Sequence, residues 1–164
     1  MSGKIAIHQP NLIPWFPFFY KMAHCDKFIL MIHCQFEKNG YQNRAFVKNE
    51  WWTLPVTNGT CDIKDKKYTN GNKLTDVNVP LILGFSKMLG IDTEKIHYDF
   101  ETKVEGKTER IIELCKRFDC DQYLTNPEAT VKYLDEKLMN DNGIEVLGYE
   151  LPPQYKKSLF EIFE

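Results

Sequence analysis

Several features that would assign this chain to a broad class of protein are missing from its sequence. No apolar run approaches the roughly 20 residues that a membrane-spanning helix needs, and the first residues, MSGKIAIHQP, contain no charged segment followed by an apolar one. The five cysteines are odd in number and form no Cys-x-x-Cys pair, so the spacing of zinc ligands is absent. We therefore expect a cytoplasmic protein with reduced thiols and no membrane span.

Strong charge and familiar catalytic motifs are missing too. The net charge is −2 and the pI is near 6.1, which argues against a nonspecific nucleic-acid binder, because phosphate contacts usually make such a domain basic. The patterns GxSxG and HExxH do not occur, and residues 101–108 are not a Walker loop because Glu101 stands where its first glycine would be. A metal site of His8 and His33 would need a third ligand at suitable spacing, so we expect no metal, and the sequence identifies no cofactor.

What the chain does contain predicts one α/β domain that spans residues 1–164. Hydrophobic residues make up 43% of the sequence, enough for a real core. Short apolar stretches alternate with stretches of helical periodicity, which predicts a mainly parallel sheet flanked by helices. We expect strands at residues 5–7, 28–32, 95–100, 122–125 and 144–150, and helices at residues 15–25, 76–89, 106–118 and 127–140. An antiparallel hairpin at residues 42–48 and 51–56, with its turn at Asn49-Glu50, should extend one edge of the sheet, and residues 58–72 should form a loop.

Polar side chains follow the first two predicted strands. His8, Gln9 and Asn11 come directly after the first strand, and His33 follows the second. Ligands of open α/β sheets bind outside the carboxyl ends of the strands, so we expect these residues and Trp15 to face a substrate. His8 would act as a general acid or base or as a phosphate ligand, while Gln9 and Asn11 would orient the substrate. The alternative is a buried histidine in a capped loop.

A second polar cluster opens the hairpin. Gln42 and Asn43 would orient a substrate, and Arg44 would hold a phosphate or carboxylate in bidentate fashion. The alternative for Arg44 is an exposed arginine on an edge strand. Trp51 and Trp52 follow each other in a strand and should point to opposite faces, so we expect one in the core and one on the surface.

Two predicted helix starts supply further candidates. Lys107, Thr108, Glu109 and Arg110 begin the third helix, where free backbone N–H groups favour an anion. Lys107 and Arg110 would stabilise substrate charge. The alternative is an ordinary amphipathic helix capped by Thr108. Asn126 precedes the fourth helix and is a further candidate for substrate binding.

The same motifs resemble those of the WbqC-like protein family. The stretch IAIHQPNLIPWFPFFYKMAHCDKFILMIHCQFEKNGYQNR is similar to the family's opening, WWTLPV resembles one of its strands, and GKTERIIELCKRFDCDQYLTNPEATVKYLDEKLMNDNGIEV resembles its second signature. The chain differs in a shorter middle section, in Thr125-Asn126 where Ser-Gly is usual, and in His33-Cys34 where acidic residues are common. The resemblance implies a cytosolic protein of surface-polysaccharide or modified-sugar biosynthesis. Relatives in phage genomes imply a second setting, base hypermodification by amino-acid transfer.

The sequence leaves three hypotheses of function open. The first is a transferase that acts on a phosphorylated or nucleotide-activated small molecule, with acyl or amino-acid transfer among the reactions considered. The second is a phage transferase that attaches amino acids to DNA bases, which a basic groove formed by Lys64, Lys66, Lys67 and Lys73 would favour. The third is a noncatalytic scaffold in a biosynthetic complex, which the 11 Phe, 8 Tyr and 3 Trp residues favour if they form an exposed patch.

Overall fold

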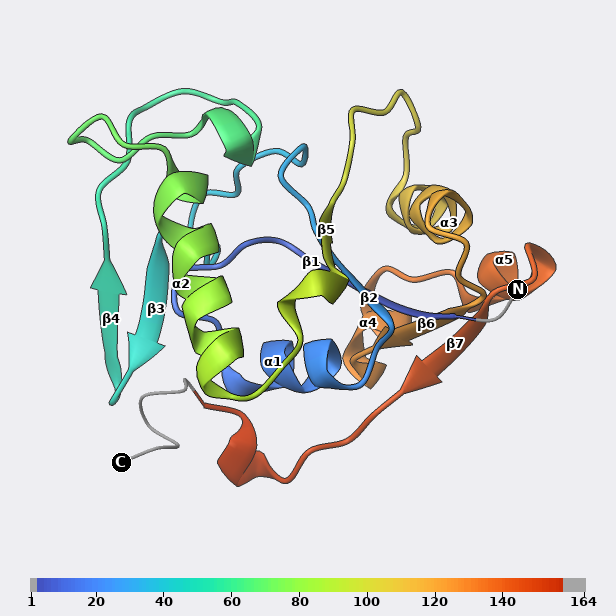
Figure 1. The fold of residues 1–164 in the computed structure, drawn as a ribbon. Helices are drawn as coiled ribbons and strands as arrows, with labels where there is room; N and C mark the ends of the chain where they lie inside the picture. Colours follow the sequence, from blue (N-terminus) through green and yellow to red (C-terminus); the bar gives the residue numbers. More distant parts are fainter. Residues whose placement is uncertain (1–2, 158–164) are drawn as a thin grey trace.

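The computed structural model describes residues 3–157 and contains a five-stranded parallel sheet with the order β5-β2-β1-β6-β7 (Figure 1). Its strands are β1 (Lys4–His8), β2 (Lys27–Leu30), β5 (Ile96–Tyr98), β6 (Gln122–Thr125) and β7 (Glu145–Gly148). The first half of the chain extends the sheet to one side of β1, and the second half extends it to the other. The direction of growth therefore reverses between β1 and β6. This is the parallel α/β sheet that the sequence predicts.

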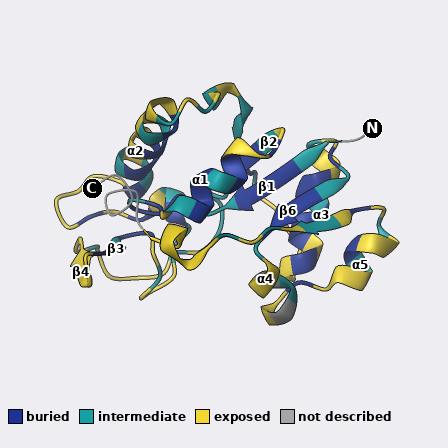
Figure 2. Ribbon diagram, turned by 90° about the horizontal axis from the view of Figure 1, so that it is seen from below, coloured by how far each residue is buried: buried dark blue, intermediate teal, exposed yellow. Residues whose placement is uncertain are grey.

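Helices cover both faces of this sheet. They are α1 (Phe16–Ala23), α2 (Leu74–Met88), α3 (Lys107–Arg117), α4 (Pro127–Lys132) and α5 (Glu136–Asp141). α1 and α2 pack with Ala6 and Phe28 on one face, whereas α3 and α5 pack with Ile5 and Ile7 on the other. Because neighbouring residues of a strand point to opposite faces, a strand between two helical layers must be apolar throughout. Figure 2 shows β1 and β6 largely buried and the outer side of α5 exposed. Among the described residues, no helix is long and apolar enough to cross a membrane.

β1 and β6 are paired over only part of their length. β1 pairs with β2 from Ile5 to His8, but it pairs with β6 only at Lys4 and Ile5. The carboxyl-terminal part of β1 is therefore joined to the sheet on one side only. Ligand sites of parallel α/β sheets commonly lie where the strand order reverses, outside the strand ends. The fold thus creates an opening at the position where such a site is expected.

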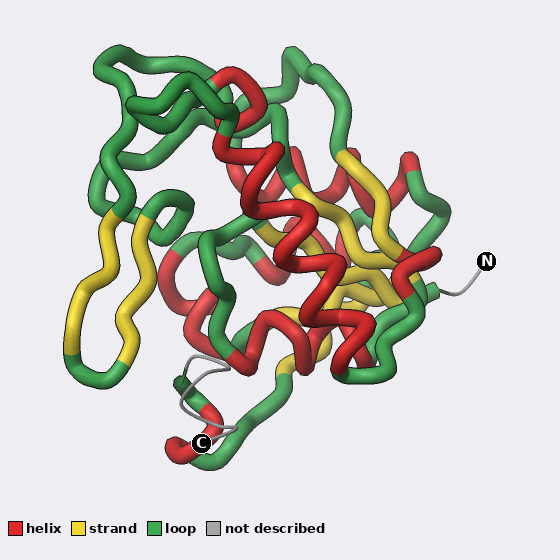
Figure 3. The backbone as a smooth tube through the Cα atoms, turned by 60° about the vertical axis from the view of Figure 1, so that its left-hand side comes forward, coloured by secondary structure: helices red, strands yellow, loops and turns green. Residues whose placement is uncertain are grey.

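The predicted hairpin forms, but it is a separate two-stranded sheet of β3 (Arg44–Val47) and β4 (Glu50–Thr53). The expectation that it extends an edge of the main sheet is wrong. Figure 3 shows the hairpin set apart from the five parallel strands. Asn78 of α2 donates a hydrogen bond to the backbone oxygen of Gln42 at 2.7 Å, which attaches the start of the hairpin near α2 instead.

The hairpin turn also differs from the prediction. It lies at Lys48-Asn49 rather than at Asn49-Glu50, because Lys48 and Asn49 both have the positive φ angles, 52° and 63°, of a type I′ turn. The expectation of one core tryptophan is wrong as well. Trp51 and Trp52 are each 45% exposed, since the separated hairpin leaves both of its faces open in part.

The predicted fourth helix is two helices, α4 and α5, because a contact from α3 interrupts it. The backbone N–H of Asp135 donates to the Thr108 hydroxyl at 2.9 Å, and the Asp135 carboxylate accepts from the N–H of Leu138 at 3.0 Å. Asp135 therefore caps α5 and cannot continue α4. Thr108, predicted as a helix cap or anion ligand, instead ties α3 to this break.

The stretch predicted as a loop, residues 58–72, contains a short 3-10 helix, Ile63–Asp65. Ile63 is fully buried in a small cluster with Tyr68 and Leu74. A second 3-10 turn, Thr93–Lys95, precedes β5, and a third, Pro153–Tyr155, follows β7. The loop is thus held by its own apolar side chains.

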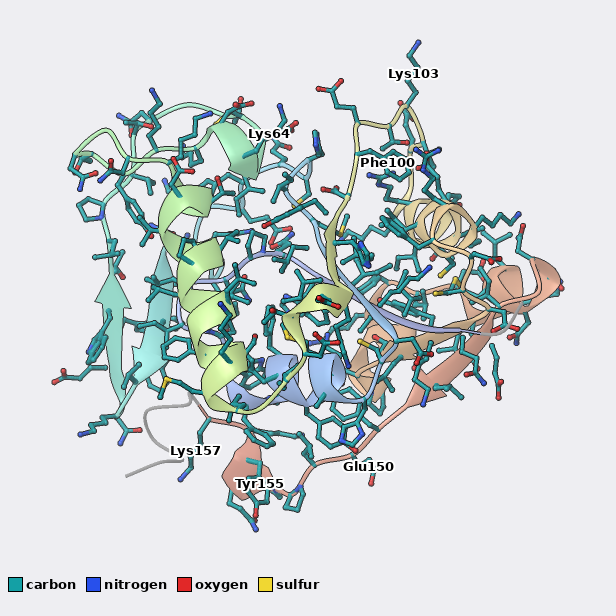
Figure 4. The ribbon with its side chains drawn as sticks, in the orientation of Figure 1. Lys64, Phe100, Lys103, Glu150, Tyr155 and Lys157 are labelled. Carbon is teal, nitrogen blue, oxygen red and sulfur yellow. The ribbon has the colours of Figure 1, made fainter. Side chains whose placement is uncertain are left out.

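The segment after β7 returns to α1. The Tyr149 and Tyr20 rings lie 5.0 Å apart, the Tyr155 and Phe16 rings 5.4 Å apart, and the N–H of Phe16 donates to the carbonyl of Lys157 at 2.8 Å. Figure 4 labels Tyr155 and Lys157 on this return path. Residues 149–157 therefore connect the second half of the sheet to the first.

Candidate active site

A cavity of about 770 Å³ lies at the carboxyl ends of the parallel strands. Each strand brings a residue to its wall: His8 at the end of β1, His33 after β2, Asp99 after β5, Thr125 at the end of β6 and Tyr149 after β7. Other walls come from α1, from the start of α3 and from the connection between β5 and α3, whose outer part carries Lys103 in Figure 4. The volume falls in the range of roughly 300–1,000 Å³ that is typical of small-molecule sites.

The imidazole of His8 is neutral and lines the cavity. Its Nδ1 lies 3.0 Å from the carbonyl oxygen of Gln9, and because a carbonyl can only accept, Nδ1 carries the hydrogen. Nε2 therefore keeps a lone pair. Burial lowers the pKa of His8 to about 3, and the charge of Lys21 acts in the same direction. The ring also packs edge-on against Phe18, at 4.7 Å between centroids. His8 thus offers a proton acceptor, held in one orientation.

Lys21 lines the same cavity, and the sequence analysis missed it. It lies in α1 and is only 8% exposed, yet no described residue accepts a hydrogen bond from its ammonium or forms an ion pair with it. Burial lowers the pKa of Lys21 to about 8. The available signal was its helical spacing from Phe18 and Cys25, which puts a lysine on an otherwise apolar face.

Arg110 also lines the cavity, but its guanidinium is already engaged. It pairs with Asp99 at 3.3 Å and with Glu113 at 2.7 Å, and it donates to the carbonyl oxygen of Phe100. Asp99, which the sequence analysis did not single out, also accepts from two backbone N–H groups just after β2, at 2.7 and 3.1 Å. The pair therefore fixes the end of β2 to the start of the connection that leads to α3.

The start of α3 is occupied by its own side chain. Gly106 caps the helix with a φ of 93°, and the Glu109 carboxylate folds back so closely that a Cβ on Gly106 would collide with it. A carboxylate at N3 satisfies a helix N-terminus much as a bound anion would. The Thr108 hydroxyl is used by the break between α4 and α5. Lys107 lines the cavity and lies over the Tyr133 ring at 5.3 Å.

Gln42 belongs to a buried network that holds the loop after β1. Its side-chain amide donates to Gln9, and Asn78 donates to the backbone oxygens of Gln42 and Pro10 at 2.7 and 2.9 Å. The Tyr68 hydroxyl in turn donates to the Asn78 side chain at 3.1 Å. Gln42 therefore supports Gln9, which lines the cavity, from behind. Asn78 is a further positioning residue that local sequence patterns did not reveal.

Six predicted residues lie outside the cavity: Gln42, Thr108 and Glu109, described above, and Asn11, Asn43 and Arg44. Asn11 is buried, and its backbone N–H donates to the carbonyl of Gln9 at 3.0 Å. The Asn43 side chain donates to a backbone carbonyl just after β4 at 2.9 Å. Arg44 stacks on Trp51, with 3.9 Å between its guanidinium carbon and the ring centroid, and donates to backbone oxygens before the hairpin. These side chains shape the hairpin and the loop beside it.

Three other predicted residues line the cavity and keep some capacity for a ligand. Trp15 is half exposed at the start of α1. Asn126 accepts the N–H of Glu128 at 2.8 Å and so supports the start of α4. The Nδ1 atom of His33 is buried and has no hydrogen-bond partner within residues 3–157. The predicted residues that the structure brings together at the cavity are His8, Gln9, Trp15, His33, Lys107, Arg110 and Asn126.

The Cys34 thiol and the Tyr123 phenol of the cavity are neutral. Burial raises the pKa of Cys34 to about 12, so its thiol stays protonated. All five cysteines are free. Burial also raises the pKa of Tyr123, which lies near Tyr133 and Thr125. In the described part of the chain, no group of three or more His, Cys, Asp or Glu side chains is placed to hold a metal ion. The cavity thus combines the imidazoles of His8 and His33, the buried amine of Lys21, the exposed amine of Lys107 and several hydroxyl groups.

Comparison with known proteins identifies the family. The profile of the WbqC-like protein family matches residues 9–72 and 61–164. The chain is also similar to the uncharacterized protein Rv1507c of Mycobacterium tuberculosis (strain ATCC 25618 / H37Rv), with 27% identity over 194 residues that cover 90% of this chain and 82% of the relative. No solved structure matches. Because the family profile covers most of the sequence, the chain belongs to the WbqC-like protein family.

Proposed function

We propose that the chain is a group-transfer enzyme that acts on a phosphorylated or nucleotide-activated small molecule, in surface-polysaccharide or modified-sugar biosynthesis. The observation that carries this proposal is the neutral His8 imidazole at the wall of a cavity of about 770 Å³, with Nδ1 fixed by the Gln9 carbonyl and Nε2 free. A fixed base in a cavity of this size suits catalysis on a small molecule. The family supplies the biosynthetic setting as an expectation.

In the proposed reaction, His8 acts as a general base. An acceptor hydroxyl or amine attacks the group to be transferred and forms a new bond to it, while its proton passes to Nε2 of His8. The bond between that group and the donor's phosphate breaks, and its electron pair leaves with the phosphate. An anion bound near the ring would raise the pKa of His8 from about 3 toward the range in which a base is effective.

The test compares His8→Asn with His24→Asn. His24 caps the end of α1, is exposed and does not line the cavity, so it is a matched control. Sugar nucleotides and nucleoside phosphates are first screened by thermal shift, because a ligand that binds the native state raises the melting temperature. Turnover of the compounds that bind is then measured. We expect kcat to fall about 10²- to 10⁴-fold in His8→Asn and to stay unchanged in His24→Asn. Equal activity in both variants contradicts the role of His8.

A scaffold role is the second candidate, and the outer face of the hairpin supports it. Tyr41, Phe46 and Trp51 are each about half exposed, and their rings contact one another. The variant Trp51→Ser distinguishes the two proposals. A scaffold would lose its partner protein in co-purification, whereas the enzyme would keep its turnover. If Trp51→Ser folds normally but loses turnover, the result argues against a reaction centred on His8 in the cavity.

Amino-acid transfer to DNA bases receives less support from the predicted basic groove. Lys66 is buried and donates to the carbonyl of Gly59 at 2.7 Å, while Lys64 and Lys73 both lie near Asp65, at 3.2 and 3.9 Å. Lysines with such partners have less charge to offer to a phosphate backbone. Binding to DNA that weakens steeply with salt would restore this hypothesis.

A further inference from the structure

We propose that Lys21 and His8 form a subsite for one phosphate group of the ligand, in which the Lys21 ammonium donates to an anionic oxygen and Nε2 of His8 accepts the hydrogen of a P–OH group. This inference rests on the proposed function and names the group that the cavity holds after transfer: the phosphate that leaves the donor, to which Nε2 of His8 returns the proton it took from the acceptor. It replaces Arg110 and the start of α3 as the anion-binding part of the site.

Lys21 is a buried cation for which the described fold supplies no acceptor. It is more than nine-tenths buried and lines the cavity. An unpaired buried charge is costly unless a partner compensates it. Two other cations of the same wall have such partners, since Arg110 pairs with Asp99 and Lys132 lies 3.7 Å from Glu128. These three and the exposed Lys107 all line the cavity, but in the described chain Lys21 is the buried one among them that has no acceptor.

The acidic residues of the cavity are not available to Lys21. Asp99 is engaged by Arg110 and by backbone N–H groups, and Glu128 lies near Lys132. Glu37 lines the cavity but is exposed to solvent, and no ion pair joins it to Lys21 in the described chain. Within residues 3–157 no carboxylate is left to pair with Lys21, and we infer that a bound molecule supplies the negative charge.

A hydrogen-bond donor and an acceptor on the same wall together select the ligand group that can satisfy both. His8 packs against Phe18 at 4.7 Å, and Lys21 lies one helical turn after Phe18 on the buried face of α1, so both groups belong to the same part of the cavity wall. An ammonium can only donate, and Nε2 of a neutral imidazole with hydrogen on Nδ1 can only accept. A phosphate group near neutral pH carries both an anionic oxygen and, in its monoanionic form, a P–OH hydrogen, since its second pKa is about 6. Carboxylate and sulfate lack that hydrogen, so the pair favours phosphate over both.

Calorimetric titration with inorganic phosphate, sulfate and acetate tests the subsite directly. We expect phosphate to bind the full-length protein at least 10-fold more tightly than sulfate or acetate. Lys21→Met should weaken phosphate binding at least 10-fold, while Lys87→Met, which removes an exposed lysine on α2, should leave it unchanged. His8→Asn should bring the affinities for phosphate and sulfate close together, because the acceptor for the P–OH hydrogen is lost.

Lys21→Arg keeps the charge and guards against loss of folding in Lys21→Met, and it should retain measurable phosphate binding. Phosphate binding that is equal in the wild type and Lys21→Met, or equal affinity for phosphate and sulfate in the wild type, overturns the subsite. These outcomes are separate from the turnover measurement. Turnover that depends on His8, together with no effect of Lys21, would reject the subsite and keep the proposed function. Phosphate binding that depends on Lys21, without any turnover, would keep the subsite and reject the proposed function.

Discussion

Lys21 and Arg110 carry the same charge and line the same cavity, at 8% and 7% exposure, but their surroundings are opposite. Arg110 reaches two carboxylates and a backbone carbonyl, and Asp99 is in turn held by the backbone at the end of β2. Lys21 meets the apolar side of α1 and no acceptor in the described chain. The comparison separates a cation that completes the fold from a cation that the fold leaves for a ligand.

The contrast also shows why position at a cavity wall is a weak guide to function. Arg110 lies at the cavity wall, as the sequence predicts. Its hydrogen bonds, however, connect three parts of the fold, namely the end of β2, the segment after β5 and α3. Lys21 belongs to no local motif, yet no described residue accepts its hydrogen bonds, so its ammonium can bind an anionic ligand. The two residues therefore differ in their hydrogen-bond partners, although both lie at the wall of the same cavity.

The largest effect is expected from Arg110→Met. Removing one partner of a buried ion pair leaves Asp99 as an uncompensated charge, so unfolding free energy should fall by about 3–5 kcal/mol in urea titrations. Adding Asp99→Asn to this variant removes that charge and should recover part of the loss. A change below about 1 kcal/mol for Arg110→Met would mean that the pair does not brace the fold and would erase its contrast with Lys21.

An intermediate effect, of opposite sign, is expected from Lys21→Met. The folded pKa of Lys21 lies at about 8, below the ordinary value of 10.5, so at pH 7 the folded state bears the cost of a buried charge. The variant should therefore be more stable than the wild type at pH 7, by up to about 3 kcal/mol. Between about pH 8 and pH 10.5 the unfolded wild type binds more protons than the folded one, so the stability of the wild type rises and the gap closes.

Urea titrations of both proteins at pH 7, 9 and 10.5 measure this gap, and the shared titrations of Cys and Tyr residues cancel in the difference. A variant that is less stable than the wild type at pH 7 would show that Lys21 has a partner within the protein. In that case Lys21 would resemble Arg110.

The smallest effect is expected from Arg44→Ala. Arg44 lies outside the cavity and stacks on the half-exposed Trp51, a contact worth about 0.5–1 kcal/mol at an exposed site. Stability should fall by that amount, and phosphate affinity measured by calorimetry should not change. A loss of phosphate affinity comparable to that of Lys21→Met would bring the hairpin into the site and blur the distinction between the two cations.

Much of the sheet follows from local sequence. Residues 122–125 form β6 with the predicted bounds, because an apolar run between turn residues leaves few other structures. The exceptions depend on distant contacts. Asp135 divides the predicted fourth helix because Thr108 accepts its N–H from another helix, and no pattern within residues 127–140 encodes that bond. The hairpin is recognisable from its alternation, but its placement depends on Asn78 in α2.

The site is predictable to the extent that strand ends converge. His8 and His33 meet at one cavity because both follow parallel strands, which is a property of the fold class. The state of each group is not encoded locally. The neutrality of His8 depends on burial and on Lys21, and the engagement of Arg110 depends on Asp99 at the end of another strand. Gln42 is a buried polar residue as the sequence indicates, but it supports Gln9 from outside the cavity.

The short pairing of β1 with β6 leaves the carboxyl-terminal half of β1 without a backbone ladder on that side. In the described chain these two strands share rungs only at Lys4 and Ile5, whereas β1 and β2 stay paired as far as His8, and β6 and β7 as far as Thr125. The returning segment at residues 149–157 joins the β7 side of the sheet to α1 at Phe16. Side chains rather than ladder hydrogen bonds therefore bound the cavity between His8 and Thr125, so substitutions there can reshape it while the sheet stays intact.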